Sequence, residues 1–576
     1  MQTLSLKKIL ALCPVIVGCY FLLFSTLSAS AQRFQWANQN RGNWSANKNI
    51  TTDAQGNVYS IAIITDSVDA DPSPIGLCKF VTRGSLDFFF RKLDKDGNFL
   101  WAKQIGGEGI ESGNTIALDA TGNVYIAGTF SGPTDFDPSA TSAFMLTSAP
   151  GVSTFVAKYS NTGDFLWAEM QGAGAEQNTA LAVDGAGNVY VSGFSQSAQV
   201  DYDPSPTATS ILTNQGGQDV FLSSFDKDGK FRWAKGLGGP GTENSNNLTV
   251  SDNGLIFLLW SFKSDSIDAD PDPVKTAFLK SGGKANVLFS IFNAQGVFQK
   301  GAGFSAKTDA FGSSLVINHQ NDVLMTGSFS GDSVDFDPYE SGTNLYSTGT
   351  DPSLFMLKMS QNGVLKWVKA FEQTFSYANS IAVDRNDNIY VGGAFQGQMD
   401  FDPSANPAVR TSKGLSDFFV AKYSTVGDFI SVDVGGDGAY DQVNSVCTDV
   451  NDNVLASGAF TGTVDFDPGI SAYSMNSVYG MGFLMKLSGE NVSGIAGVAG
   501  RSANLKAYPN PFRDLLIVEA TKSGDYELVD ALGKVVRTGT LTAGRNPIAV
   551  AELSEGVYVF RTIFDGNEPE TLLLVK

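Results

Sequence analysis

The feature that most constrains this chain is a repeat of about 66 residues. A short acidic motif, Asp-aromatic-Asp-Pro or a close variant, occurs seven times, at steps of 66, 66, 67, 67, 65 and 65 residues. Its aspartate pairs are Asp69/Asp71, Asp135/Asp137, Asp201/Asp203, Asp268/Asp270, Asp335/Asp337, Asp400/Asp402 and Asp465/Asp467. A fixed period indicates repeat units that each pack on their neighbours.

Two other landmarks keep this period and predict what each unit contains. Asn123-Val124-Tyr125 and Phe155-Val156-Ala157-Lys158-Tyr159 of the second unit recur in other units. Around them, four runs alternate apolar and polar residues, at 115–119, 123–130, 154–159 and 164–169, with glycine turns between them. Four short strands per unit, repeated radially, predict the blades of a β-propeller.

The order of the landmarks predicts how the ring of units is completed. The second unit ends in a Leu-Trp-Ala strand around Trp167, but the seventh unit runs from 483–487 into glycine-rich sequence without one. Phe34-Gln35-Trp36-Ala37 near the N-terminus has the missing pattern. The predicted fold class is therefore all-β: a seven-bladed propeller of four-stranded blades over residues 32–488, closed by the N-terminal strand, plus a small C-terminal β-sandwich.

These landmarks together carry a family resemblance. Asp-x-x-Gly-Asn-Val-Tyr-Val, Phe-Val-Ala-Lys-Tyr and Leu-Trp-Ala are similar to the bacterial β-propeller repeats of the SBBP type, over about residues 34–488. The resemblance implies the fold and says little about activity, because propellers host many functions.

The pattern changes after the last repeat. Residues 489–504 are small and glycine-rich and are predicted to be a linker. From 505 to 576, short alternating runs predict strands at 515–519, 525–529, 534–538, 556–560 and 572–576, which is typical of a small sandwich.

This C-terminal segment resembles the type A C-terminal sorting domain of the type IX secretion system. The resemblance rests on Pro509-Asn510-Pro511, Gly533 before Lys534-Val535-Val536, Gly556-Val557-Tyr558 and the final lysine. It implies that residues 505–576 engage the type IX secretion machinery. The passenger would then be exported to the outer surface of a gram-negative cell or released outside it.

The N-terminus reads as an export signal. Lys7 and Lys8 precede an apolar run over 9–27, and Ala29-Ser30-Ala31 fits a cleavage site before Gln32, so residues 1–31 are predicted to be a signal peptide. A lipoprotein cleavage box ending at Cys19 is the alternative, but it would cut inside the apolar run. No later segment is long and apolar enough to predict a transmembrane helix.

The net charge limits the classes of ligand, and the cysteine content limits the possible disulfides. The formal net charge of −20 disfavours nucleic acid as a ligand and leaves glycans, proteins and cations. Cys78 and Cys447 remain after signal cleavage, and whether they pair is left open because spacing alone does not establish disulfide geometry.

The repeated aspartates allow two interpretations. In a propeller blade they lie in the loop between the second and third strands, where carboxylates accept backbone N–H groups and proline fixes the exit. Alternatively, all fourteen aspartates in the seven pairs are candidate ligands for Ca²⁺, which prefers oxygen ligands. Acids in the connections between units should emerge on the same face and ring it with carboxylates. These acids are Glu111, Glu176, Glu243, Asp309 and Asp441.

No catalytic residue stands out, because a motif copied into every unit points to scaffolding. The one histidine, His319, is predicted to be a surface turn residue. We therefore expect a non-enzymatic binding or scaffold module that binds a glycan or protein through the acidic loop face, with recognition where the units differ. The fourth unit, with its apolar run 255–260, differs most in sequence. The alternative is a glycosidase-like enzyme that uses a carboxylate pair on the loop face.

Overall fold

The computed structural model describes residues 32–576 with a set of short gaps. These gaps are 173–175, 273, 281–285, 307–308, 331–333, 338–343, 346–351, 372–374, 405, 469–471, 492–504, 509–512, 531–534, 555 and 565–569. The described chain divides into two bodies, residues 32–490 and 491–576, called here the repeat domain and the C-terminal domain. The predicted signal peptide (1–31) and most of the predicted linker lie outside the described residues.

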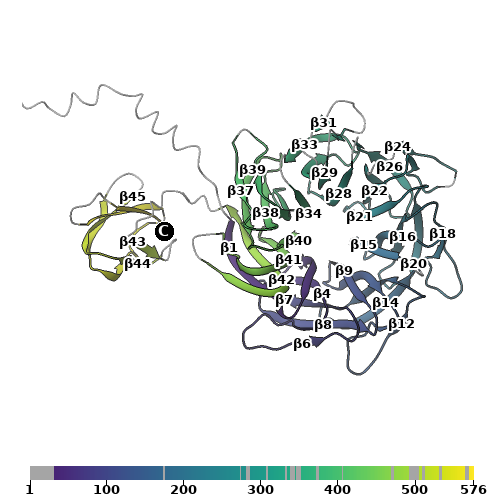
Figure 1. Cartoon of the computed structure of the whole chain (residues 1–576), viewed down its shortest axis with the longest axis horizontal. Helices are drawn as coiled ribbons and strands as arrows, with labels where there is room; N and C mark the ends of the chain where they lie inside the picture. Colours follow the sequence, from purple (N-terminus) through teal and green to yellow (C-terminus); the bar gives the residue numbers. More distant parts are fainter. Residues whose placement is uncertain are drawn as a thin grey trace, which may run out of the picture. The chain divides into compact units, whose positions relative to one another are not determined.

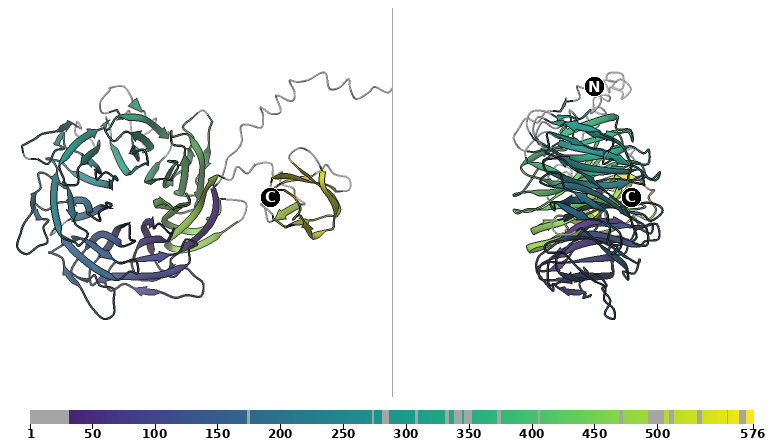
Figure 2. Two further views of the ribbon diagram at one scale, coloured as in Figure 1. Left: turned by 180° about the vertical axis from the view of Figure 1, so that it is seen from behind. Right: turned by 90° about the vertical axis from the view of Figure 1, so that its right-hand side faces the viewer.

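The regular elements of the described residues are β-strands, so the all-β prediction is confirmed. In the ranges that the structure describes, no helix is long and apolar enough to cross a membrane. The sheets of the repeat domain are arranged radially, as in a propeller (Figures 1 and 2).

The second repeat unit shows how the sequence builds one sheet. β9 (Glu111–Leu118), β10 (Val124–Phe130), β13 (Ser153–Tyr159) and β14 (Phe165–Gln171) pair antiparallel in that order. They are the four predicted strands, with ends displaced by a few residues. Every residue of β10 and β13 is buried, as expected for inner strands whose two faces are both covered.

The other units repeat this order. In the first, third and fourth units the strands are β3 (Ser45–Thr52), β4 (Val58–Ile64), β7 (Asp87–Leu93), β8 (Phe99–Gly107); β15 (Glu176–Val183), β16 (Val189–Ser195), β19 (Asp219–Phe225), β20 (Phe231–Leu237); and β21 (Glu243–Val250), β22 (Ile256–Phe262), β25 (Asn286–Phe292), β26 (Phe298–Gly303). In the fifth and sixth they are β28 (Ala310–Ile317), β29 (Val323–Phe329), β32 (Ser353–Met359), β33 (Leu365–Phe371); and β34 (Ser376–Val383), β35 (Ile389–Phe395), β38 (Asp417–Tyr423), β39 (Phe429–Gly435).

Short ribbons that the alternation did not predict extend from the loops between second and third strands. In the first and fifth units they also include a short strand that precedes the first strand of the unit, β2 (Arg41–Gly42) or β27 (Ser305–Ala306). In the second unit, β11 (Pro133–Asp135) pairs with β12 (Met145–Thr147) and with the end of β8. The other ribbon strands are β2 (Arg41–Gly42), β5 (Ser67–Asp69), β6 (Lys79–Val81), β17 (Gln199–Asp201), β18 (Ile211–Thr213), β23 (Ser266–Asp268), β24 (Phe278–Lys280), β27 (Ser305–Ala306), β30 (Val334–Asp335), β31 (Asn344–Leu345), β36 (Gln398–Asp400) and β37 (Val409–Thr411). In each unit the first aspartate of the acidic motif is the last residue of a strand.

The N-terminal strand pairs with the seventh unit. β1 (Gln32–Gln39) lies beside β42 (Ser474–Asn491), followed by β41 (Val454–Asp465) and β40 (Gln442–Thr448). In Figure 1, purple β1 runs along green β42. The indole Nε1 of Trp36 donates to the carbonyl of Lys95 in the first unit at 3.3 Å, and Lys486 Nζ of β42 donates to the same oxygen at 3.0 Å.

The Asp-x-x-Gly-Asn-x-Tyr landmark is a turn that the sequence closes locally. Asp119 Oδ1 accepts the backbone N–H groups of Thr121 and Asn123 at 3.0 Å, and its Oδ2 accepts the Tyr125 hydroxyl at 3.2 Å. Gly122 supplies the positive φ of 81°. The Phe-Val-Ala-Lys-Tyr landmark adds Lys158, whose Nζ lies 3.6 Å from Asp119 Oδ2.

The repeated tryptophans link successive units. Trp101 Nε1 donates to the carbonyl of Asn161 in the next unit at 3.3 Å, and Trp167 Nε1 donates to Lys227 at 3.2 Å. Both side chains are half-buried. They pack against the core and against the glycine turns of the following unit.

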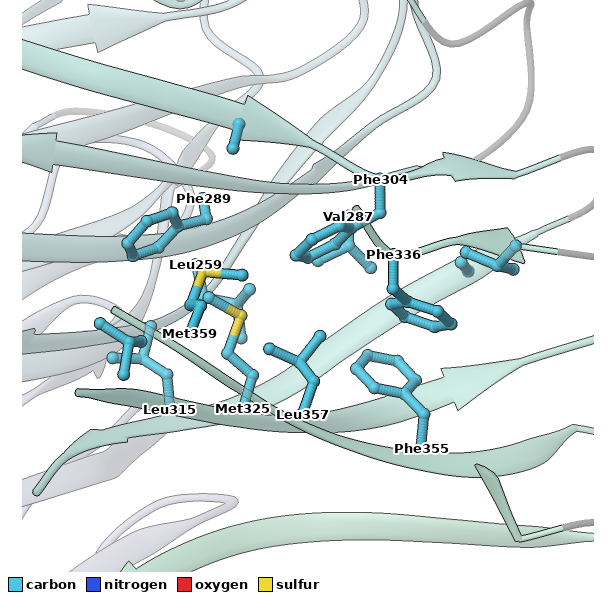
Figure 3. Packing of buried hydrophobic residues seen from close by; sticks show 14 of the residues in the cluster. Leu259, Val287, Phe289, Phe304, Leu315, Met325, Phe336, Phe355, Leu357 and Met359 are labelled. Atoms are coloured by element: carbon cyan, nitrogen blue, oxygen red, sulfur yellow. The ribbon is translucent and has the colours of Figure 1, made fainter. Parts of the chain in front are cut away.

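The core lies between neighbouring sheets. In Figure 3, Leu259 and Phe289 of the fourth unit interdigitate with Met325 and Leu357 of the fifth. The apolar run of the fourth unit belongs to this core, since every residue of β22 is buried and Trp260 Nε1 donates to Ser290 Oγ at 3.0 Å. That run is therefore packing and not a recognition site.

The C-terminal domain consists of two antiparallel sheets around one core. One sheet has the order β43 (Leu505–Tyr508), β44 (Leu515–Ala520), β47 (Gly544–Ala549), and the other β46 (Val535–Leu541), β45 (Gly524–Asp530), β48 (Val557–Phe564), β49 (Glu570–Val575). Leu516 and Phe560 pack in the shared core. The final Lys576 exchanges two backbone hydrogen bonds with Gly556. Pro509-Asn510-Pro511, Gly533 and Lys534 lie outside the described residues.

Candidate functional site: the loop face of the repeat domain

The first aspartate of each acidic motif clamps its own loop. In the second unit, Asp135 Oδ1 accepts the backbone N–H of Asp137 at 3.0 Å and that of Phe144 at 2.9 Å, so one oxygen ties together both ends of the loop. The same double acceptance occurs at Asp69, Asp201, Asp268, Asp400 and Asp465. In the fifth unit, Asp335 Oδ1 accepts from Asp337 at 3.1 Å.

The second aspartate of the motif caps the turn that follows it. In the second unit, Asp137 Oδ1 accepts from Ser139 N at 2.9 Å. The same bond, from the backbone N–H two residues further on, is made by Asp71, Asp203, Asp270 and Asp402. In the seventh unit, Asp467 donates its own backbone N–H to Asp465 Oδ1 at 3.1 Å. The carboxylates of the second aspartates are thus engaged by their loops in five units, the first to fourth and the sixth, as the structural interpretation of the motif expects.

The residue between the two aspartates is also fixed in place, by burial of its side chain and a hydrogen bond to its carbonyl. It points inward, and the carbonyl of Phe136 accepts the hydroxyl of buried Tyr159 at 3.0 Å. In the first unit, buried Arg91 makes the equivalent hydrogen bond: its Nη1 donates to the carbonyl of Ala70 at 2.9 Å. The motif is therefore anchored to the third strand of its own unit.

This geometry is consistent with the structural interpretation of the repeated motif. Within the described chain, no group of three or more His, Cys, Asp or Glu side chains gathers as a metal ion would require, so the structure does not bring the predicted calcium ligands together. This holds for the first aspartates of the pairs and equally for the second, which are Asp71, Asp137, Asp203, Asp270, Asp337, Asp402 and Asp467. Calcium at the fourteen aspartates remains a prediction that a titration can test.

The two cysteines of the repeat domain do not pair. Cys78 and Cys447 are both free thiols in the structure. The question that the sequence left open is thus answered against a disulfide in this structure.

The acids between units do not form an exposed ring of carboxylates, contrary to expectation. Glu111, Glu243 and Asp441 are fully buried and bind groups of their own unit boundary. Glu111, for example, accepts the N–H of Gly107 at 2.7 Å and the hydroxyl of Thr134 at 3.0 Å. Burial raises the pKa of Glu111 and of Asp441 to about 6. Polar burial depends on tertiary packing, which the sequence pattern does not report. The remaining two differ: Asp309 is half-buried, and the side chain of Glu176 lies outside the described residues.

The third unit departs from the first at one such buried acid. In the first unit, Gln104 Nε2 donates to Asp87 Oδ2 at 2.6 Å. The third unit has Gly236 where the first has Gln104, and a cavity of about 20 Å³ lies beside Asp219 and Gly236. Asp219 Oδ1 is buried with no hydrogen-bond partner among the described residues. Burial, with the nearby charge of Glu243, raises the pKa of Asp219 to about 6.

His319 lies on the opposite face and is exposed in its turn, as predicted. Its Nδ1 is 2.9 Å from Asp387 Oδ1, and the same carboxylate oxygen accepts the His319 backbone N–H. Asp387 has a positive φ of 59° where most units have glycine, and its carboxylate bridges two neighbouring turns. His319 is thus part of a link between units.

The units differ at the inner rim of the loop face. Two equivalent positions flank the start of each first strand: the second residue of that strand in most units, and the residue two places before it. In the second to fourth units the described residues there are Ile110, Ser112, Gln177, Thr242 and Asn244. From the fifth unit round to the first they include Phe311, Phe375, Tyr377, Tyr440 and Trp44. Together with Tyr479, which lies close by on the seventh unit, these aromatic residues are called here the rim arc.

Most of the rim arc is exposed, whereas Trp44 and Tyr377 are half-buried. Phe311, Phe375 and Tyr440 have 38%, 42% and 69% of their surface accessible. The rings of Phe375 and Tyr377 pack edge to face with centroids 5.7 Å apart, and the Tyr377 hydroxyl donates to Gln442 Oε1 at 3.1 Å. Sequence reasoning missed this cluster because its residues belong to connections of variable sequence. A comparison of the units position by position at the first strand would have found it.

Comparison with known proteins bears on both domains. Residues 506–575 match the family model of the secretion system C-terminal sorting domain, and residues 100–136 match that of the β-propeller repeat. Both resemblances inferred from the sequence are thereby confirmed. The sorting domain indicates secretion by the type IX system to the cell surface or the extracellular space.

Longer similarities carry no activity to this chain. An uncharacterized WD repeat-containing protein of Acanthamoeba polyphaga mimivirus is 22% identical over 65% of the chain and 32% of its own length. The regulatory protein FlaEY of Caulobacter vibrioides is 31% identical over 33% of the chain and 19% of its own length. The chain thus spans a third or less of these relatives. A solved WD40 β-propeller domain of Doa1 is 9% identical, with a TM-score of 0.27 over 81% of this chain and 99% of its own.

Proposed function

We propose that this protein is a secreted seven-bladed β-propeller, closed by its N-terminal strand, that acts as a non-enzymatic binding or scaffold module for a glycan or protein. The seven acidic motifs and the repeated four-stranded sheets support the blade number. The pairing of β1 with β42, and the bonds from Trp36 and Lys486 to Lys95, support the closure.

One observation carries the binding role. The carboxylates repeated in every unit are engaged by their own loops, whereas the side chains that differ between units are exposed at the inner rim of the same face. Exposed aromatic residues in one sector of a soluble protein mark interaction sites more often than folding requirements.

We also propose the part that the C-terminal domain plays in export. Residues 505–576 would engage the secretion machinery as a folded domain, since Lys576, directly after its last strand, is tied into the domain. Lys576 Nζ donates to the carbonyls of Val550 at 2.5 Å and Ala551 at 2.9 Å, in addition to its backbone pairing with Gly556. Deletion of the last strand should therefore retain the protein inside the cell envelope.

A combined binding and turnover assay tests the function. The secreted chain is incubated with a panel of polysaccharides and with envelope proteins, and bound protein and newly formed chain ends are both measured. The proposal predicts retention on one class of ligand with no new ends. Turnover that disappears with a single Asp or Glu substitution would establish the glycosidase-like alternative instead.

A further inference from the structure

The rim arc has a composition that selects among ligands. Its rings come from consecutive units, because β28, β34 and β40 follow one another along the inner side of the ring and β3 contacts β40 (Figure 1). Gly480 beside Tyr479 lies against Trp44, so Tyr479 extends the arc at its first-unit end. The arc therefore covers one continuous sector of the rim.

Hydrogen-bonding groups lie among these rings. Gln442 accepts from Tyr377 with Oε1, which leaves its amide Nε2 to donate to a ligand. The exposed phenol of Tyr440 can both donate and accept, and it lies close enough to Tyr377 to contribute, after burial, to the raised pKa of that phenol. Sugars need this combination, because their C–H faces stack on rings while their hydroxyls require polar partners.

The charge of the sector also discriminates between ligands. Among the described residues in the connections of the fifth and seventh units, Asp309 and Asp437 are half-buried, Asp441 is buried, and all three are acidic. The one basic group among the described residues that acts on Asp437 is Lys413. An acidic polysaccharide would be repelled by these carboxylates. A neutral glycan would not be affected by them.

From these observations we propose that the rim arc is a binding site for an uncharged polysaccharide, whose sugar rings stack on Phe375 and Tyr440. This inference rests on the proposed binding function and specifies its ligand and its residues. Folding of a unit does not require aromatic residues here, since the second to fourth units have small or polar residues at most of the equivalent positions. Trp44 differs from the rest of the arc, because it also packs against the core.

The test compares two double variants of the secreted chain. Phe375→Ala with Tyr440→Ala removes the centre of the arc. The control, Ile211→Ala with Phe278→Ala, removes comparably exposed apolar surface from the ribbons of the third and fourth units. Affinity electrophoresis is run in gels containing glucan, mannan or xylan, and in a matched gel containing a polyuronate.

The expected result is retardation of the wild type by at least one neutral polysaccharide and not by the polyuronate. The arc variant should bind roughly tenfold more weakly or worse, while the control binds like the wild type. Neutral-glycan binding that survives in the arc variant would overturn the inference and leave the proposed function standing. Retardation by the polyuronate alone, or by no polysaccharide, would also overturn it. In the latter case, retention of envelope proteins in the earlier assay decides whether a binding function remains.

Discussion

The acidic loops and the rim arc lie on the same face of the repeat domain, yet they differ in almost every respect. The loops recur in all units, and their carboxylates accept hydrogen bonds from backbone N–H groups a few residues away. The arc occupies one sector, and most of its rings are exposed. In a repeat protein, what is common to all units tends to hold the fold, and what is confined to a few units is free to serve a ligand.

The largest loss of stability should come from a substitution in the repeated turn that begins at Asp449, on the opposite face. Asp449 and Lys486 form an ion pair of 2.7 Å with side chains that are 0% and 3% exposed. Asp449→Ala leaves a buried ammonium without its counter-charge and should lower the free energy of unfolding by about 3–5 kcal/mol in urea titration. Asp428→Ala, which removes an exposed partner 3.8 Å from Lys369, is the control and should change it by less than about 1 kcal/mol. Equal effects would contradict a structural role for the repeated turn.

A smaller effect should appear where the third unit departs from the first. The pKa of Asp219 is about 6 when folded and 3.8 in its ordinary state, so the folded chain binds this proton more tightly. Its contribution to stability is complete below about pH 4 and is lost as the pH rises through 6. Asp219→Asn should therefore reduce the loss of unfolding free energy between pH 5 and 8 by about 1–2 kcal/mol. An unchanged pH profile would show that the buried carboxylate does not titrate in this range.

Introducing the glutamine of the first unit at the equivalent position of the third unit should stabilise the protein. Gly236→Gln places an amide where Gln104 serves Asp87, and an added Cβ meets Leu212 at an ordinary 3.7 Å. The variant should gain about 1 kcal/mol, because it fills the cavity, supplies a donor to Asp219 and removes a glycine from a strand. Denaturant midpoints at pH 7 measure the gain, and a loss would mean that the third unit does not superimpose on the first here.

The smallest effect should be that of calcium. Since the first aspartate of the motif already accepts two N–H groups in most units, melts with saturating calcium and with excess chelator should coincide. A stabilisation of about 2.7 kcal/mol at a hundredfold excess over the dissociation constant would turn the acidic loops into metal sites. That outcome would remove the contrast between the acidic loops and the rim arc.

Much of the fold could be predicted from the sequence because its determinants are local. Asp119 and Gly122 specify a turn within five residues, and the alternation around Tyr125 specifies a strand. The ribbons were missed because three-residue strands carry no periodic signal. β47 was missed because Asn546 and Pro547 are typical of turns.

The candidate site was less predictable for a related reason. The burial of Glu111 depends on Thr134 and on the end of the preceding sheet, which no local pattern encodes. Phe375 and Tyr440 occur in connections that vary in sequence, so only the register of the first strands reveals them as equivalent. The expectation that recognition lies where units differ led to the arc, although not to the fourth unit, whose apolar run is core.

The central claim is that shared features hold the fold and sector-specific features bind the ligand. Measuring stability and polysaccharide affinity together for Asp400→Ala and Tyr440→Ala tests it most directly. Asp400→Ala, which strands the N–H groups of Asp402 and Ala408, should cost about 1–2 kcal/mol and leave affinity unchanged. Tyr440→Ala should leave stability within about 0.5 kcal/mol and weaken binding. Loss of binding in a folded Asp400→Ala protein, with full affinity in Tyr440→Ala, would contradict the claim.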